Sequence, residues 1–373
     1  MGDRVVLLVD GKELGDWTSY DIDSNMAVDA DFFSLSVDAF RRSDLDLLAP
    51  YSQVDVIIND CQQMKGLIER VDAEVGRDSS RLTVSGRSLA ALLVDSSPPP
   101  GRYADVTILE LAADLAASFG VEVATTTSAR QQAANTPGMD RRPPVDTVLS
   151  RAGIAADDLR TQPGDSVWGF IAGLAEKLGL HVWMDPDGTL IIGLPTYDAE
   201  PNGYVWRALP DGKRPELNNV LDGGMHLDWS GRFSEITKVG QRTVFGERLV
   251  GVVRVPTSSQ VRFSSTETDG GFLGKEYKPL RASSSAPNAA TLQAETRLDM
   301  QTRLYQSEEY RYTVFGHSQG RMLWQPDMMA ICYDEKVGLD DVLYLTGRRF
   351  TRSRTGGTRT QLTLRRPNIW LAA

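Results

Sequence analysis

The stretch Val54-Asp55-Val56-Ile57-Ile58-Asn59-Asp60 has a counterpart near the other end of the chain, Met329-Ala330-Ile331-Cys332-Tyr333-Asp334-Glu335. Each stretch reads as a strand, and two further strand-like stretches follow each of them. Their offsets are 275, 276 and 280 residues, so the spacing is nearly conserved. This internal repeat predicts two related β modules. The corresponding stretches are 54–60 with 329–335, 67–75 with 343–351, and 81–87 with 361–367.

The first module shows the period of two that is typical of half-buried strands. Phe33, Leu35 and Val37 alternate with polar residues, and turn-forming pairs such as Asp10-Gly11 separate the runs. The apolar stretch Val5–Val9 is shorter than the apolar core of a signal peptide, about 7 to 15 residues, and we interpret it as the first strand. The pattern predicts an antiparallel sheet or small barrel.

A second, weaker echo links the two modules. Val220-Leu221-Asp222-Gly223-Gly224, followed by Trp229, resembles Val9-Asp10-Gly11, followed by Trp17. We interpret this echo as further support for two related β modules.

The middle of the chain has the hydrophobic period of helices. Asp105 is predicted to cap a helix that ends before Gly120, and Asp165 to cap a second helix that ends before Gly179. The predicted apolar faces are Ile108, Leu111, Ala112, Leu115 and Phe119 in the first helix, and Val167, Ile171, Leu174 and Leu178 in the second.

A short strand is expected after each helix. Asp185-Pro186-Asp187-Gly188 is predicted to turn the strand 180–183 into a hairpin with residues 189–192. The polar segment 125–161 is expected to be rich in loops, and residues 289–305 are expected to form a helix.

Together these patterns predict an α+β protein that is mainly β, with two related antiparallel β-barrel-like modules plus α/β modules. The predicted parts are a first β-barrel module at 1–96, a mixed α/β module at 97–200, a discontinuous second β-barrel module at 201–243 and 310–373, and an inserted strand and helix segment at 244–309.

The sequence predicts no catalytic, cofactor-binding or metal site. His181, His226 and His317 are far apart in sequence, and we interpret them as imidazoles on strand surfaces. Gly316-His317-Ser318-Gln319-Gly320 fits the G-x-S-x-G string of a nucleophile elbow, but Pro326 leaves no room for the required helix and no histidine follows.

Acidic residues offer no better candidate for catalysis. The turn 185–188 resembles the start of a calcium loop but lacks the acid that would close it, and Asp157-Asp158 and Asp340-Asp341 are interpreted as solvated pairs. Cys61 and Cys332 are expected to be two buried reduced thiols, with a disulfide between them as the alternative.

The net charge of −10 argues against nonspecific nucleic-acid binding by the whole surface. One C-terminal stretch is nevertheless basic and contains no acid, and it is expected to face a partner subunit, solvent or DNA. Its arginines are Arg348, Arg349, Arg352, Arg354, Arg359, Arg365 and Arg366.

The order of these pieces resembles the Mu-like contractile phage tail proteins, which are related to the T-even phage baseplate hub and to the hub part of type VI secretion spike proteins. The specificity lies in the order of the motifs, because none of them is chemically demanding. The matching residues are 5–11 with Trp17, 33–37, 164–168, 174–180, 187–190, 307–310, 323–327 and 360–364.

The resemblance implies a homotrimer that forms a ring between the tail tube and the central spike protein, within the virion tail baseplate and assembled in the bacterial host cytoplasm. Other baseplate proteins are implied partners, DNA could pass through the ring, and no cofactor is implied. Two similar modules in each of three chains would present six similar units, which suits adaptation of a three-fold spike to a six-fold tube. Exposed strand edges are candidates for pairing across subunits.

Two other functions remain open. The seven tryptophans allow a β protein that binds carbohydrate on the host surface, although Trp17, Trp183 and Trp229 stand in strand-like patterns typical of core packing. A tail-associated cell-wall hydrolase would need a cluster of catalytic carboxylates or a metal site, which the sequence does not predict.

Overall fold

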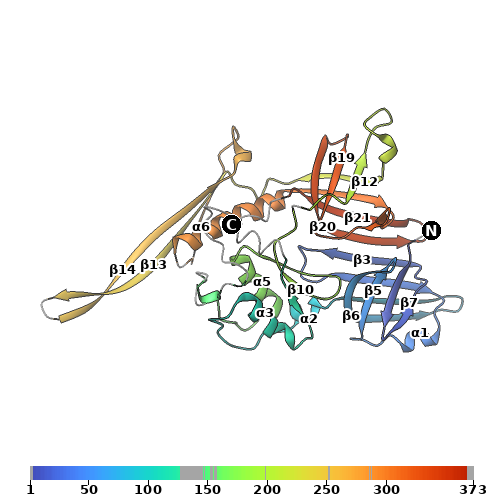
Figure 1. The fold of residues 1–373 in the computed structure, drawn as a ribbon, viewed down its shortest axis with the longest axis horizontal. Coiled ribbons are helices and arrows are strands. Elements are labelled where there is room, and N and C mark those ends of the chain that lie inside the picture. Colours follow the sequence, from blue (N-terminus) through green and yellow to red (C-terminus); the bar gives the residue numbers. More distant parts are fainter. Residues whose placement is uncertain are drawn as a thin grey trace.

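The computed structural model describes residues 3–126, 146, 148–151, 154, 158–197, 199–250, 253–284, 286 and 288–367. The fold is mainly β, as predicted, and its largest sheet contains 13 strands. Figure 1 shows two β modules stacked one on the other, a helical part beside them, and a long hairpin that projects away. No helix in the described part of the chain is long and apolar enough to cross a membrane.

The first module is an antiparallel arrangement in the order β3-β4-β7-β6-β5-β1-β2. Alternating side chains such as Ile22, Phe33 and Leu35 are completely buried, which confirms the period of two. Its elements are β1 (Val5–Val9), β2 (Lys12–Leu14), β3 (Ser19–Asn25), β4 (Phe32–Asp38), α1 (Arg42–Asp46), β5 (Gln53–Ile58), β6 (Cys61–Val75) and β7 (Ser80–Ser88).

The second module repeats this order as β12-β16-β21-β20-β19-β11. One difference is that β11 pairs with β19 in parallel, whereas β1 pairs with β5 antiparallel. The strands are β11 (Gly203–Arg207), β12 (Val220–Leu227), β16 (Glu308–Phe315), β19 (Met328–Asp334), β20 (Leu339–Ser353) and β21 (Gly357–Arg365), with η2 (Pro215–Leu217) and the small hairpin β17 (Ser318–Gln319) and β18 (Met322–Leu323) between them.

The long strands β6 and β20 show how close the repeat is. Each has 15 residues, pairs with the preceding strand through its first half and with the following strand through its second half. Each also has a bulge against the following strand, after Ile68 in β6 and after Leu345 in β20. Both of these residues are completely buried. Aligning the bulges therefore makes Ile68 and Leu345 equivalent.

Strand pairing corrects the weaker of the two echoes. β12 pairs with β16 as β3 pairs with β4, so residues 220–224 belong to the counterpart of β3 and not to a counterpart of the Val9–Gly11 stretch that they resemble. The sequence pattern is misleading because a short apolar run before Asp and Gly is common to many strand ends. Consistently, Trp17 is buried whereas Trp229 is half-buried.

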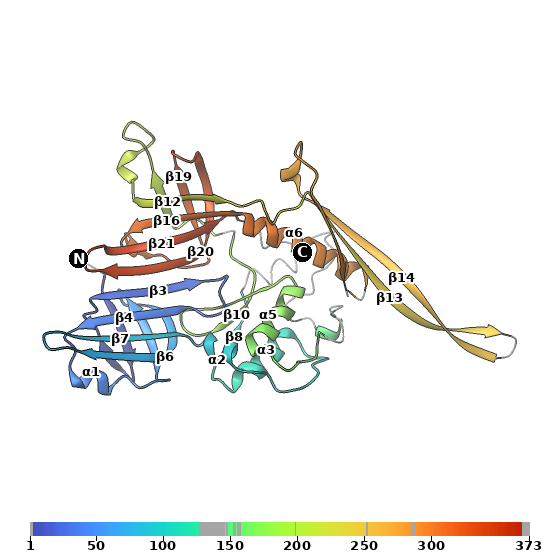
Figure 2. The same ribbon diagram turned by 180° about the vertical axis from the view of Figure 1, so that it is seen from behind.

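The two modules join edge to edge. Residues Tyr20–Asn25 of β3 pair antiparallel with Gly347–Arg352 of β20, so one hydrogen-bonded sheet runs through both modules. Figure 2 shows the resulting stack, with the second module above the first.

The helical part packs on the first module around a small three-stranded sheet in the order β8-β10-β9. Both predicted helices and the hairpin at 185–188 form, but the caps are one or two residues later than expected. Thr107 and Ser166 accept the capping hydrogen bonds in place of Asp105 and Asp165, because Asp105 has a positive φ and Asp165 binds the Gln162 amide instead. The elements are α2 (Ala90–Asp95), α3 (Ile108–Ala117), β8 (Val123–Ala124), η1 (Leu149–Arg151), α5 (Val167–Lys177), β9 (His181–Met184) and β10 (Leu190–Gly193).

The segment between the halves of the second module forms a projecting hairpin, which we call the arm. The predicted helix at 289–305 is confirmed and lies along the base of the arm. The predicted boundary between the second module and the inserted segment, at residue 244, stays a prediction. It falls inside β13, which begins at Glu235. The predicted loops at 125–161 fall largely outside the described residues. The elements are β13 (Glu235–Val250), β14 (Val253–Thr268), η3 (Gly270–Phe272), β15 (Pro279–Ser284) and α6 (Ala289–Ser307).

Candidate assembly interface

Within the described part of the chain, the strand edges that correspond to the contact between β3 and β20 are unpaired elsewhere in the molecule. The second half of β20 is flanked by β21 on one side and by β3 on the other. The equivalent half of β6, residues 70–75, pairs with β7 on one side and with no strand on the other. β12, which takes the place of β3, pairs with β16, and none of the described strands pairs with its other edge, although β11 lies near its first half. The open edges lie at opposite ends of the stack (Figure 2).

The open edge of β12 carries apolar side chains that solvent reaches. Leu221, Met225 and Leu227 are 50%, 42% and 50% exposed. Apart from the hydrogen bonds with β16, one hydrogen bond among the described residues reaches the backbone of residues 221–227 from a neighbouring element. Arg207 Nη1 donates it to the Gly223 carbonyl at 3.0 Å. A strand edge of this kind is a template for pairing with another chain.

A cavity of about 440 Å³ lies beside this edge. Met225 and Leu227 line it from β12, Tyr310 from β16 and Leu339 from β20. In the first module, Ile22 on β3, the strand that corresponds to β12, is completely buried in the hydrophobic core. The second module thus lacks part of its packing at this edge.

The open edge of β6 is also partly apolar. Val75 is 77% exposed, Ala73 is exposed and Val71 is half-buried. Asp72, which lies between Val71 and Ala73 in sequence, points to the other face of the strand and accepts a hydrogen bond from Arg70 Nε at 2.6 Å. The sequence pattern did not single out these edge residues. The signal was present in their alternation, but only the strand pairing shows which edges stay open.

A buried histidine links the two modules. His317 is completely buried, with its Nε2 2.8 Å from the Tyr20 hydroxyl and its Nδ1 3.0 Å from Thr360 Oγ1. Burial lowers the pKa of His317 to about 4, so the ring is neutral near pH 7. The prediction of a surface imidazole is wrong for His317, because β3 and β20 close over it. His226 is exposed, as predicted, and His181 is half-buried against the Met26 carbonyl.

Arg348 is the second buried link. Its guanidinium donates to the Ile22 carbonyl at 3.3 Å and to Gln63 Oε1 at 3.2 Å, so it joins β20 to β3 and β6. Burial lowers its pKa to about 10, and burial raises the pKa of Asp31 to about 6. A polar cavity of about 150 Å³ beside it is lined by Arg348, Arg349 and Asp23, among others.

The other arginines of the C-terminal stretch do not form one basic patch in the described structure. Arg349 pairs with Asp21, and Arg354 with Asp38, which ties β20 to the first module. Arg365 pairs with Glu309, and Arg366 with Glu308 and Asp341, all within the second module. Arg352, Arg354 and Arg359 are exposed near the β20–β21 turn and are the members best placed to meet a partner.

The candidate nucleophile motif has no elbow geometry. Ser318 belongs to the hairpin of β17 and β18, and no helix follows it. His317 in the same motif turns to Tyr20 and Thr360. Of the acidic pairs, Asp340 pairs with Lys213 and Asp341 with Arg366, and Asp157 lies outside the described residues.

Two further expectations need correction. Both cysteines are free, but Cys61 is exposed because it follows the turn between β5 and β6, and only Cys332 is buried. Trp17 and Trp183 are buried as expected, whereas Trp229 is half-buried and lies under the cations of Arg232 and Lys275, at 3.8 and 3.7 Å from its ring centroid.

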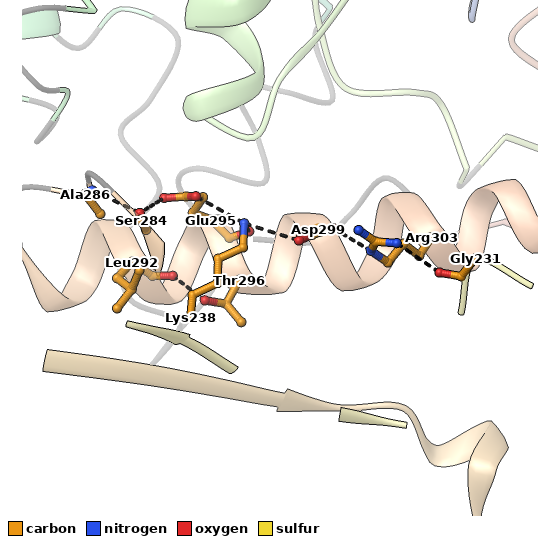
Figure 3. A network of polar contacts seen from close by, with 9 residues as sticks. All are labelled: Gly231, Lys238, Ser284, Ala286, Leu292, Glu295, Thr296, Asp299 and Arg303. Atoms are coloured by element: carbon orange, nitrogen blue, oxygen red, sulfur yellow. Dashed lines mark hydrogen bonds and ion pairs between the residues drawn. The ribbon is translucent and has the colours of Figure 1, made fainter. Parts of the chain in front are cut away.

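The arm is fixed to helix α6 by ion pairs (Figure 3). Lys238 of β13 is 9% exposed, and its Nζ lies 3.1 Å from Glu295 Oε1 and 3.3 Å from Asp299 Oδ2. Asp299 also accepts a hydrogen bond from Arg303 Nε at 2.7 Å, and Arg303 Nη1 reaches the Gly231 carbonyl at 3.0 Å. The base of the arm is therefore a fixed extension of the second module.

Comparison with known proteins places this fold among phage tail proteins. Residues 4–88 match the family described as Mu phage baseplate assembly protein GpP-like, N-terminal, and residues 303–369 match the family described as tail protein, C-terminal domain. These two matches fall on the first module and on the second half of the second module. The resemblance to Mu-like tail and baseplate proteins is confirmed.

Three particular proteins are similar over most of their length. The baseplate hub protein gp44 of Escherichia phage Mu is 25% identical over 338 residues, which cover 88% of this chain and 79% of that protein. The tail protein from Neisseria meningitidis MC58 is 27% identical, with a TM-score of 0.75 over 99% of this chain and 98% of that one. The 43 kDa tail protein of prophage MuSo2 from Shewanella oneidensis shares the fold, with 19% identity and a TM-score of 0.71 over 99% and 100% of the chains.

Proposed function

We propose that this protein is a structural hub of a contractile phage tail baseplate, and that three copies form a ring between the central spike protein and the tail tube. Similarity to the Mu hub protein and to the Neisseria tail protein supports the structural role in a baseplate. The observation that carries the ring is the repeat of one strand order in both modules. Three chains then supply six similar modules. The ring has three-fold symmetry when whole chains are compared and approximate six-fold symmetry when modules are compared.

The ring performs its function by geometry, without catalysis. A spike with three-fold symmetry meets one chain per contact, and a tube with six-fold symmetry meets one module per contact. Other baseplate proteins bind around it in the virion, after assembly in the host cytoplasm. The exposed arginines Arg352, Arg354 and Arg359 face acidic neighbours or a central channel for DNA. Changing all three to glutamate should weaken tube docking in the first case and leave assembly intact in the second.

The test is the mass of the purified protein by light scattering over a concentration series. A ring predicts a mass of three times 41.0 kDa and particles with six similar lobes in negative-stain images. A monomer at every concentration, alone and after mixing with the tail tube protein, would contradict the proposal. Binding of host-surface glycans by such a monomer would favour the receptor-binding alternative.

A further inference from the structure

We propose that neighbouring copies join by strand addition, with β12 of one copy pairing antiparallel with residues 70–75 of β6 in the next. This inference rests on the proposed ring and specifies the contact that would close it. The chain itself supplies the template, because β3 already pairs with the matching half of β20. A second copy is therefore the occupant that the open edge of β12 fits.

The register follows from two equivalent rows of paired residues. In the first module the row runs Ile68, Gly86, Phe33, Ile22 across β6, β7, β4 and β3. In the second module it runs Leu345, Leu364, Tyr310, Met225 across β20, β21, β16 and β12. Each row starts at the residue before the bulge. Met225 is thus equivalent to Ile22.

The contact inside the chain then fixes the contact between chains. Ile22 pairs with Phe350, which lies five residues after Leu345. The residue five positions after Ile68 is Ala73. Met225 of one copy therefore lies opposite Ala73 of the next, and by the same count Leu227 lies opposite Val71.

The side chains on the two edges match in chemistry. Ile22 is completely buried in its contact with β20, whereas its equivalent Met225 is 42% exposed. The pairs of Met225 with Ala73 and of Leu227 with Val71 would cover apolar surface on both strands. On the opposite face, His226 would lie opposite Asp72, an acidic partner for a basic ring. The incoming β6 edge would also close the cavity of about 440 Å³ beside Met225.

The position of the edges favours a closed ring. They lie at opposite ends of the stack, so the contact is head-to-tail (Figure 2). A head-to-tail contact forms a ring when its rotation closes. If the contact between chains repeats the geometry of the contact within the chain, six modules follow one another around the ring, two from each copy.

Cysteine cross-linking tests the register. In a Cys61→Ser background, the pair Ala73→Cys and Met225→Cys in one chain should give disulfide-linked dimers and trimers under mild oxidation, and a reductant should release them. The shifted pair Asp72→Cys and Met225→Cys should cross-link roughly tenfold less, because adjacent strand residues point to opposite faces. Mixing the two single variants should give linked dimers only.

A second variant tests the strand pairing without introduced cysteines, in case the double-cysteine variant does not fold. Val75→Lys changes a side chain that is 77% exposed, and lysine on a strand edge opposes pairing. We expect the trimer to dissociate at a protein concentration at least roughly tenfold higher than wild type, with circular dichroism unchanged. Val28→Lys, at a residue 52% exposed in the turn between β3 and β4, is the matched control and should leave the mass unchanged.

The outcomes separate the register from the ring. A trimer that links at Ala73 and Met225 supports both. Cross-linking of the trimer only through the shifted pair would overturn the proposed strand pairing but not the ring. The same conclusion would follow from a trimer that does not cross-link and is insensitive to Val75→Lys. A wild-type monomer that never links overturns both.

Discussion

The Tyr20 hydroxyl and His317 Nε2 form a buried hydrogen bond of 2.8 Å that joins β3 of the first module to the turn after β16 in the second. Phe350 of β20 packs against the same imidazole with its ring tilted by 41° and the ring centroids 4.4 Å apart. A polar side chain between two apolar modules is stabilising only while both of its ring nitrogens have partners, which Tyr20 and Thr360 provide.

His317 should make the protein less stable in mild acid. Its pKa is about 4 in the folded chain, against an ordinary value of 6.5, so the unfolded chain binds the proton first as the pH falls. Its contribution is present above pH 6.5 and is lost between pH 6.5 and 4, by about 3 kcal/mol at most. Urea unfolding of wild type and His317→Gln at pH 7 and 4.5 measures this. The stability advantage of wild type should shrink at pH 4.5.

The control for this experiment is His226→Gln, because His226 is exposed on β12. Equal differences between wild type and His317→Gln at the two pH values would show that His317 does not stay neutral in the folded protein.

Replacement of Arg348 should separate the modules energetically. Arg348→Ala removes the donor to Gln63 Oε1 and one of the hydrogen bonds to the Ile22 carbonyl, and it leaves a buried space, which should cost about 3 to 5 kcal/mol. Arg354→Ala, at an exposed arginine of the same strand region, should cost less than about 1 kcal/mol. Chemical denaturation of both variants checks the contrast. A small loss for Arg348→Ala would mean that the buried guanidinium contributes little to holding the modules together.

Gly86 should be irreplaceable for steric reasons. A Cβ at this position would lie 1.8 Å from the Leu67 carbonyl oxygen and 2.9 Å from the Phe33 ring, so Gly86→Ala must displace the backbone of β6. We expect a loss of about 1 to 3 kcal/mol. In contrast, Gly173→Ala in α5 meets nothing within 4 Å and should stabilise the helix by about 0.5 to 1 kcal/mol. Thermal unfolding should shift the two variants in opposite directions.

Loss of Lys238 should loosen the arm without unfolding the modules. Lys238→Ala leaves Glu295 and Asp299 facing one another without their shared cation, at a site that is mostly buried. Hydrogen exchange in β13 and β15 should become faster, by about tenfold for a loss near 1.4 kcal/mol, while β3 and β4 keep their protection. Lys213→Ala, which breaks the exposed pair with Asp340, is the control. Unchanged exchange in β13 would show that backbone pairing alone holds the arm.

The residue pattern alone predicts the strand repeat, the two helices with their apolar faces, the helix at the base of the arm and the resemblance to Mu-like tail proteins. These features are local or periodic, because a strand such as 54–60 and a face such as Leu111 and Leu115 follow from spacing along the chain. The caps were missed by one or two residues because Asp, Thr and Ser compete for the same role at adjacent positions.

The pairing of strands, in contrast, becomes visible only in the packed chain. The equivalence of Met225 and Ile22 depends on hydrogen bonds between strands far apart in sequence, and local patterns do not encode such partners. Likewise, His317 and Arg348 look like surface residues of strands until β3 closes over them. Burial is a property of the packed modules, whereas the sequence specifies only the side chains that packing then buries or leaves exposed at the open edges.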